Sequence, residues 1–323
     1  MTPTDFTSCC SAATLQALKG GCVATVGFFD GVHRGHRFLL KRLRETAAGQ
    51  RLPSLVISFW PHPRKVLHQT ALPLLTDNAE KQSLLKECGI DHVVILPFTP
   101  GFASLTAAGF MRDVLAGQFH VKSLLMGYDH RFGRPQPDMD SFEDYRRCGR
   151  TLGIDVIRAE ALTRDTSSAE ASPIGSSAIR EALLAHRIDE ANEALGYPYR
   201  ISGRVVGGFE NGHRIGFPTA NILPDSADKL LPADGVYAVK VSIDHQGSFD
   251  GMLNIGHRPT LHNGDGRSIE VNIFDFADDI YDRHITVSVC RFLREEQEFR
   301  STESLSAQLA KDREEALRLL KTV

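Results

Sequence analysis

The sequence predicts an α/β protein in which a Rossmann-like parallel-sheet domain is followed by a small antiparallel β domain. At 323 residues the chain exceeds the size at which a single hydrophobic core stops growing, so two domains are expected. Strand and helix patterns alternate in the first half, whereas short strand-like runs between turn residues follow residue 196. We therefore expect two domains, residues 1–185 and residues 186–323.

The first half begins with a short buried strand at 22–26, a glycine-punctuated loop at 27–35 and a helix at 38–46. The pattern then repeats, with strands expected at 55–59, 92–96 and 123–126 and helices at 79–88 and 107–116. This alternation is typical of a parallel sheet covered by helices, which binds ligands at the carboxyl ends of its strands.

The second half changes to antiparallel patterning. Strands are expected at 199–206, 235–243, 249–254, 268–276 and 285–292. The last segment, 304–320, combines spaced leucines with many charges, which predicts an amphipathic helix packed on a barrel or sandwich.

Composition argues against several classes of protein. The formal charge is −3, and 37 basic and 40 acidic side chains are interleaved without a basic stripe, so no nucleic-acid partner is expected. There is no run of 18 apolar residues and no signal-peptide pattern, so we expect no membrane partner and a cytoplasmic location. The six cysteines lack metal-ligand or disulfide spacing, which favours reduced thiols. The sequence gives no indication of oligomeric state.

The loop at 27–36 is the first candidate site. It follows a strand and opens a helix, where backbone N–H groups and the helix dipole favour an anion. His33 and His36 flank Gly35, so both imidazoles could point to one polyphosphate while the glycine lets the backbone approach. The alternative is that the glycines serve a turn and the histidines cap the helix.

A glycine-rich stretch at 203–221 is the second candidate site. Thr219 and Asn221 are two residues apart, so in an extended chain their oxygens face one side and could hold Mg²⁺ together with phosphate oxygens. A turn-rich surface loop would carry the same residue types.

Several segments, in order and spacing, resemble the bacterial bifunctional riboflavin kinase/FMN adenylyltransferase (FAD synthetase) family. The resemblance runs from about residue 22 to about residue 315, and it is carried by the segments 27–36, 58–63, 127–133, 174–180, 203–221, 231–237, 254–260, 269–276 and 292–299. It implies a Rossmann-like nucleotidyltransferase domain followed by a small antiparallel β-barrel riboflavin kinase domain with a C-terminal helix.

The resemblance also implies two reactions. Riboflavin would be phosphorylated to FMN, and FMN would be adenylylated to FAD with release of pyrophosphate. ATP would be the co-substrate of both steps, Mg²⁺ the cofactor, and riboflavin, FMN and FAD the substrates or products. The partners are therefore expected to be small molecules.

In the first domain the resemblance assigns catalytic roles to His33, His36 and Arg180. The residues implied to bind nucleotide or flavin there are Gly27, Phe29, Asp30, Gly35, Phe59, His62, Pro63, Asp129, Ser176 and Ser177. For Asp30 and Asp129 a share in metal binding and a loop-capping role both stay open. The chain departs from the family pattern at Phe28, where Asn is frequent, Trp60, where an acid is usual, Gly175, where Ser is usual, and Ala178, where Arg is usual.

In the second domain the resemblance makes Glu270 the general base and Thr219 and Asn221 the metal ligands. The residues implied to bind nucleotide or flavin there are Gly208, Gly212, Arg214, Gly216, Pro218, Arg294, Glu295 and Glu298. The departures are His213, where Arg is common, and Asp282, where Gly is usual; neither falls on the general base or on the two metal ligands.

Two alternatives remain open. In one, only the kinase is active and the first domain binds nucleotide or flavin without turnover. In the other, the chain is a flavin-responsive binding protein that releases neither ADP nor pyrophosphate.

Overall fold

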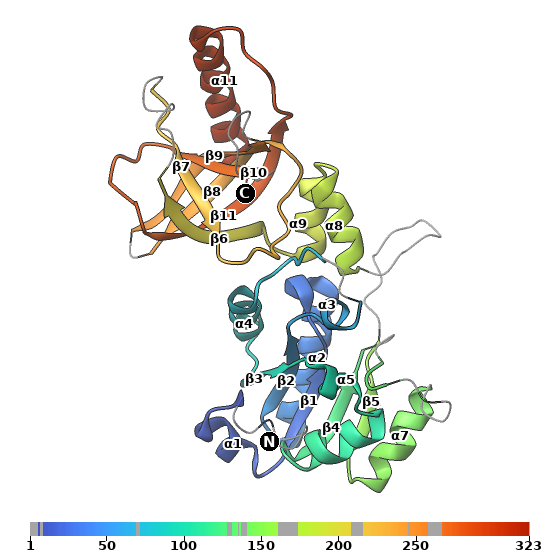
Figure 1. Ribbon diagram of the computed structural model, residues 1–323. Helices are drawn as coiled ribbons and strands as arrows, with labels where there is room; N and C mark the ends of the chain where they lie inside the picture. The colour runs from blue at the N-terminus through green and yellow to red at the C-terminus, as the bar shows by residue number, and fades with distance from the viewer. Residues whose placement is uncertain are drawn as a thin grey trace. The chain divides into compact units, whose positions relative to one another are not determined.

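The computed structural model describes residues 6, 9–68, 72–127, 131–134, 136, 141–160, 174–207, 216–244, 246–257 and 267–322. The chain divides into two compact units, Met1–Ile174 and Gly175–Val323. The boundary expected between residues 185 and 186 falls between helices α8 and α9 of the second unit. Figure 1 shows a sheet flanked by helices in one unit and a barrel in the other.

The first unit alternates strands with helices, as the sequence predicts. Its strands are β1 (Cys22–Val26), β2 (Ser54–Trp60), β3 (His92–Pro97), β4 (Val121–Met126) and β5 (Asp155–Arg158). Its helices are α1 (Ala12–Leu18), η2 (Asp30–Val32), α2 (Arg34–Gln50), α3 (Pro63–His68), α4 (Asn78–Glu87), α5 (Pro100–Ala103), α6 (Ala107–Gly109), η3 (Phe110–Ala116) and α7 (Phe142–Thr151).

The five strands are parallel and lie in the order β3-β2-β1-β4-β5. The strand order reverses between β1 and β4, because the chain proceeds outward from β1 first to one side and then to the other. In such sheets ligands bind at the carboxyl ends of the strands beside this reversal. The loop at 27–36 leaves the end of β1, so the topology positions it for binding.

Local sequence signals explain where several helices begin. Asp77 and Glu80 form a reciprocal capping box at the start of α4, and Ser141 and Asp144 do the same for α7. One helix was expected at 107–116. The structure has two consecutive elements there, because the segment starts as α6 and continues as the π-helix η3. Phe110, Met111, Val114 and Leu115 of η3 are buried against the sheet.

The second unit opens with two short helices and continues as a closed antiparallel barrel. The helices are α8 (Ser176–Leu184) and α9 (Ile188–Leu195), and the barrel strands are β6 (Tyr199–Val206), β7 (Ala220–Pro224), β8 (Gly235–Ile243), β9 (Gly247–His257), β10 (Arg267–Ile273) and β11 (His284–Arg294). The order around the barrel is β10-β7-β6-β11-β8-β9, and β10 closes it by pairing with both β7 and β9. The strand pattern alone left barrel and sandwich open, and the structure is the barrel that the family resemblance implies.

Helices cover the outside of this barrel. Helix α11 (Thr302–Leu320) packs against β8, β9 and β11, with Ala316 and Leu320 buried in the contact. The Asn192 amide of α9 donates to the carbonyl of Val289 (2.9 Å) and accepts from the amide of Tyr199 (2.8 Å). These bonds tie α9 to β11 and β6, so the two short helices belong to the barrel unit.

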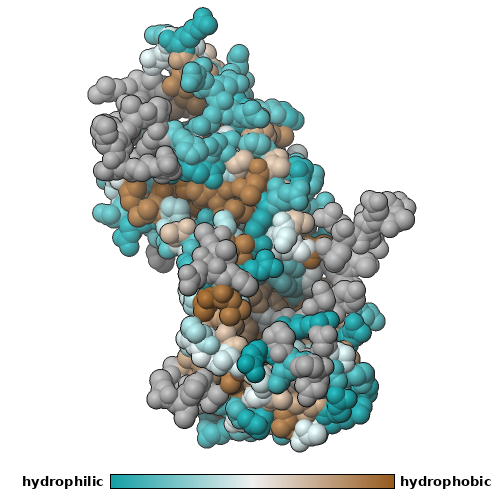
Figure 2. Space-filling model, turned by 45° about the vertical axis from the view of Figure 1, so that its right-hand side comes forward, coloured by the Kyte–Doolittle hydropathy of each residue, from teal (hydrophilic) through white to brown (hydrophobic). Residues whose placement is uncertain are grey.

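Polar side chains dominate the face drawn in Figure 2, with apolar patches between them. In the part of the chain that the structure describes, the large apolar side chains with substantial exposure are Leu67, Leu184, Leu223 and Tyr281. Among the described residues, every helix is too short or too polar to cross a membrane.

Candidate active sites

The stacked histidines of the first unit sit where β1 gives way to helix α2. His33 is the N-cap of α2, and its Nδ1 accepts from the backbone N–H of His36 (3.3 Å). The two rings are stacked, with centroids 3.6 Å apart and planes 18° apart. Helix capping is therefore one role of His33, and the cap also holds both imidazoles together at a helix N-terminus, where anions are favoured.

Gly35 is required by the close packing around these rings. A Cβ at this position would lie 3.2 Å from two atoms of the His33 ring and 3.3 Å from the carbonyl oxygen of Ile174. Gly27, at the end of β1, is similarly confined, since its Cβ would lie 2.9 Å from the Phe29 ring. The two glycines therefore allow close packing beside the His33 and Phe29 rings.

Asp30 holds the loop in place from within. Its carboxylate is 4% exposed and accepts from the backbone N–H groups of Leu75 (3.1 Å) and Thr76 (3.0 Å) and from the Thr76 hydroxyl (3.2 Å). This is the loop-fixing arrangement that the sequence left open. Phe29 has a positive φ of 56° and directs its ring to within 5.1 Å of the His36 ring.

An aromatic cavity of about 390 Å³ lies in the same unit. Its walls include Phe28 after β1, Phe59 of β2 and Pro63 at the start of α3. Later segments contribute Phe98, Phe102, Phe110 and Phe132. The His62 ring lies beside this wall, 4.1 Å from the Phe28 ring. A pocket of this size and composition suits a flat, largely apolar ring system.

Ser176, Ser177 and Arg180 lie on helix α8, in the second unit. Gly175 precedes the helix as its N-cap, without a side-chain capping bond, and the two serines occupy the first turn. Arg180 is partly buried one turn later. Asp129, Gly208, Gly212 and Arg214, together with the departure His213, lie outside the described residues.

The second site is a row of polar side chains across three barrel strands. Glu270 of β10 pairs in register with Asn221 of β7 on one side and with Asn254 of β9 on the other. Directly opposed residues of antiparallel strands direct their side chains to the same face. The Thr219 hydroxyl, just before β7, lies 3.5 Å from a Glu270 carboxylate oxygen. The structure thus brings together the predicted base and both predicted metal ligands.

Asn272 and Gly216 shape the segment that carries Thr219. The amide of Asn272, 6% exposed, donates to the carbonyl of Pro218 (2.6 Å) and so fixes the backbone next to Thr219. Gly216 has a φ of 80°, a conformation that glycine adopts without strain. Asn272 was not singled out from the sequence, although it lies two residues after Glu270 and therefore on the same strand face.

A second cavity, of about 260 Å³, opens beside Thr219. Its lining is largely apolar and includes Pro218, Ala220, Ile273 and Tyr281. An apolar slot next to hydroxyl and carboxylate oxygens suits a nucleobase whose phosphates extend toward the polar row.

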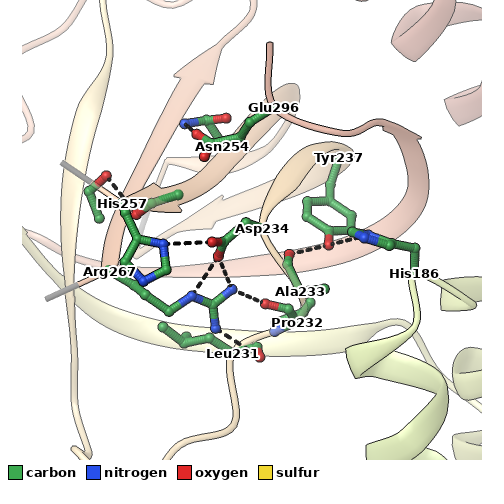
Figure 3. Close-up of polar contacts among 12 residues, drawn as sticks. His186, Leu231, Pro232, Ala233, Asp234, Tyr237, Asn254, His257, Arg267 and Glu296 are labelled. Carbon is green, nitrogen blue, oxygen red and sulfur yellow. Dashed lines mark hydrogen bonds and ion pairs between the residues drawn. The ribbon is translucent and has the colours of Figure 1, made fainter. Parts of the chain in front are cut away.

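Arg294 ends β11, and Glu295 and Glu298 follow it. Arg294 forms an ion pair with Asp312 of α11, with Nη2 2.8 Å from Oδ2, and the two side chains are 15% and 5% exposed. Glu295 and Glu298 are exposed. Glu296 is the acidic residue that reaches the polar row, because its Oε1 accepts from the Asn254 amide (3.1 Å; Figure 3). A Cβ on Gly256 would lie 1.9 Å from the same carboxylate oxygen, so glycine makes room for Glu296.

Figure 3 also shows how the turn before β8 is anchored. Asp234 accepts from Nε of Arg267 (2.7 Å) and contacts Nδ1 of His257 (2.7 Å). The Tyr237 hydroxyl donates to the carbonyl of Ala233 and lies 3.3 Å from Nδ1 of His186, and burial raises the pKa of this phenol. These contacts brace β8 and β9 behind the polar row.

The donors for a metal ion are hard oxygens. Within the described ranges no three His, Cys, Asp or Glu side chains gather into a metal-binding cluster. Thr219, Asn221 and Glu270 instead offer the sparse oxygen set that suits Mg²⁺ when phosphates supply the other ligands. All six cysteines are free, and burial raises the pKa of Cys22 to about 12.

Comparison with known proteins identifies both halves. A family model described as FAD synthetase matches residues 15–172, and one described as riboflavin kinase matches residues 195–320. The bifunctional riboflavin kinase/FMN adenylyltransferase of Escherichia coli strain K12 is 40% identical over 298 residues, 92% of each chain. That of Listeria monocytogenes is 35% identical over 302 residues, covering 91% of this chain and 90% of the relative.

A solved structure agrees in fold. The crystal structure described as a macrolide-efflux protein from Streptococcus pneumoniae superposes with a TM-score of 0.81 at 32% identity, covering 91% of this chain and 93% of that one. The matches span both units in the same order as the two sites. The chain therefore belongs to the bifunctional riboflavin kinase/FMN adenylyltransferase family.

Proposed function

We propose that this enzyme makes FMN from riboflavin in its barrel and FAD from FMN in its parallel-sheet domain, using ATP in both steps. The proposal is supported by a cavity in each unit, by the stacked His33 and His36 rings in the first, and by Thr219, which lines the second cavity and lies 3.5 Å from the Glu270 carboxylate. The alternative of a lone kinase is not favoured, because family models match both halves.

In the barrel, Glu270 is assigned as the general base. The riboflavin 5′-hydroxyl attacks the γ-phosphorus of ATP, the bond to the bridging oxygen breaks, ADP leaves, and Glu270 takes the hydroxyl proton. The position of Thr219 3.5 Å from this carboxylate supports the assignment. Thr219 and Asn221 are the proposed Mg²⁺ ligands, and bound Mg²⁺ would neutralise phosphate charge. The apolar cavity beside Thr219 is assigned to the adenine ring.

In the parallel-sheet domain, the FMN phosphate attacks the α-phosphorus of ATP and pyrophosphate leaves. His33 and His36 are assigned to the phosphates, because both imidazoles lie at the N-terminus of α2. The aromatic cavity is assigned to the isoalloxazine ring, with Phe59 and Pro63 in its wall. On the family resemblance, we attribute residues 1–185, which include Ser176, Ser177 and Arg180, to adenylylation and residues 186–323 to the kinase.

We place the reactions in the cytoplasm, with small molecules as the only partners assigned. The interleaved charge of the chain supports this, because it offers no basic stripe for nucleic acid.

The test is to incubate the purified chain with riboflavin, ATP and Mg²⁺ and to separate the flavins by chromatography over time. FMN followed by FAD is expected. FMN alone would leave only the kinase, and binding without either product would favour a flavin-responsive binding protein.

A further inference from the structure

Lys81 is a fully buried lysine next to the aromatic cavity. It lies on α4 and is 0% exposed, on the helix face that also buries Leu84 and Leu85. Its ammonium donates one hydrogen bond, to the carbonyl of Phe59 (3.1 Å). No described carboxylate lies within ion-pair distance of it. A buried ammonium without a paired carboxylate is unusual, since desolvation of the charge is costly.

Aromatic rings surround the ammonium instead. Nζ of Lys81 lies 4.0 Å from the centroid of the Phe28 ring and 5.6 Å from that of Trp60. The negative face of an aromatic ring attracts a cation, and the attraction is strongest where water is excluded. Burial lowers the pKa of Lys81 to about 8, and the negative charge of Asp30 opposes this shift. The lysine is therefore charged at neutral pH and held mainly by rings and one carbonyl.

Two of the residues that Lys81 contacts belong to the cavity wall. Phe28 and Phe59 both line the cavity, at the ends of β1 and β2. Phe28 also contacts the His62 ring (4.1 Å), and its carbonyl accepts from the Ser58 hydroxyl (3.0 Å). Lys81 thus lies behind the wall and contacts both strand ends, while its own side chain has no exposed surface from which to touch a ligand.

We propose that Lys81 is a positioning residue for flavin binding in the adenylylation site, acting through the Phe28 ring and the Phe59 carbonyl. The inference rests on the proposed function, in which FMN occupies this cavity. A lysine that fixes the ring wall governs how well the flavin is held, and it leaves the phosphate chemistry at His33 and His36 unchanged. The expected signature is thus a raised KM for FMN, with KM for ATP and kcat little altered.

The experiment measures FAD formation from FMN and ATP by the full chain, without riboflavin. Lys81→Met keeps the length of the stem and removes the charge and the donor. We expect its KM for FMN to rise about tenfold, as for loss of one desolvated cation–π contact. Lys86→Met, an exposed lysine on the same helix, is the matched control. The riboflavin kinase rate of each variant reports that the second unit is intact.

A double-mutant cycle tests whether Lys81 acts through the ring. Phe28→Leu is also expected to raise KM for FMN. The KM of the double variant should be about equal to that of the poorer single variant, because both changes remove the same interaction. Additive effects, or an equal rise in KM for ATP, would overturn the proposal. If Lys81→Met does not fold, Phe28→Leu decides, since an unchanged KM for FMN in that variant overturns it too.

FAD formation by the wild-type chain distinguishes failure of this inference from failure of the proposed function. A wild-type chain that makes no FAD removes the adenylyltransferase assignment. A wild-type chain that makes FAD, alongside a Lys81→Met variant with unaltered kinetics, removes only the role of Lys81.

Discussion

At the end of β1 the first site presents two stacked imidazoles and a helix N-terminus, whereas the barrel site presents a carboxylate among amide and hydroxyl oxygens. The proposed nucleophiles account for the contrast. An FMN phosphate is already ionised and needs only alignment and neutralisation of charge, while a riboflavin hydroxyl must lose a proton as it attacks. Comparing the two sites shows that one chain can separate these demands by giving each its own fold.

Removal of the carboxylate is the strongest test of this contrast. Glu270→Gln should lower the riboflavin kinase rate about a thousandfold, since a general base contributes on this order, and should leave FAD formation from FMN unchanged. Both rates are measured on one preparation, by chromatography of the flavins. Glu314→Gln, an exposed acid on α11, is the control. A variant that kept full kinase activity would show that the hydroxyl needs no proton acceptor from the protein.

The two units also differ in what stabilises a buried positive charge. Arg294 has a paired carboxylate in Asp312, whereas Lys81 relies on rings. Asp312→Ala leaves a mostly buried guanidinium unpaired, so the free energy of unfolding of the second unit should fall by about 3 kcal/mol. Chemical denaturation followed by kinase activity measures this. An unchanged midpoint would mean that Arg294 is free to serve another role, such as the flavin contact implied by the family resemblance.

Loss of one imidazole tests the first site. His36→Ala should lower the rate of FAD formation about a hundredfold, because one preorganised contact to the phosphates is removed, and should not affect the kinase. His92→Ala, at the start of β3, is the control. If both rates fell in a folded protein, the two sites would not be independent.

The smallest effect concerns stability and pH. The pKa of Lys81 is lowered in the folded state from 10.5 to about 8, so below pH 8 the protein keeps a charge that burial disfavours. Between pH 8 and about 10.4 the unfolded state binds a proton that the native state lacks, so stability rises with pH. Lys81→Met should therefore be more stable by about 2 kcal/mol at pH 7, after loss of one hydrogen bond.

Trp60, the single tryptophan, lies beside Lys81 and reports unfolding of the first unit by its emission. The difference in stability between wild type and Lys81→Met should shrink as the pH rises from 8 to about 10. A difference that stayed constant with pH would show that Lys81 does not titrate in this range.

The sequence predicted the elements well, because hydrophobic periodicity and turn residues are local signals. The parallel sheet, the antiparallel second half and the C-terminal helix are all confirmed. Closure of the barrel was expected from the family resemblance and not from local patterns, since it depends on pairing of Glu270 with Asn221, 49 positions apart in the chain (270 − 221). The short strand β5 was missed because its four residues begin and end with charges.

Some site residues were likewise predicted from the sequence, and others were found only in the structure. Thr219, Asn221 and Glu270 were predicted from motifs, and the structure brings them together. Lys81 was overlooked because a lysine between Glu80 and Gln82 resembles an ordinary solvated charge. The available signal was its spacing to Leu84 and Leu85, which puts it on the apolar face of α4. Glu296 was passed over for its neighbours, since only the fold shows which acid of the run reaches Asn254.

Closure of the barrel has a consequence for misfolding. Each of the six described barrel strands is paired on both sides, so none of them is an edge strand. The sheet of the first unit ends in β3 and β5, and the edge strand β3 carries the apolar run Val93–Leu96. On heating, intermolecular strand pairing should therefore begin at the adenylylation half of the chain, and the kinase half should be the last to enter aggregates.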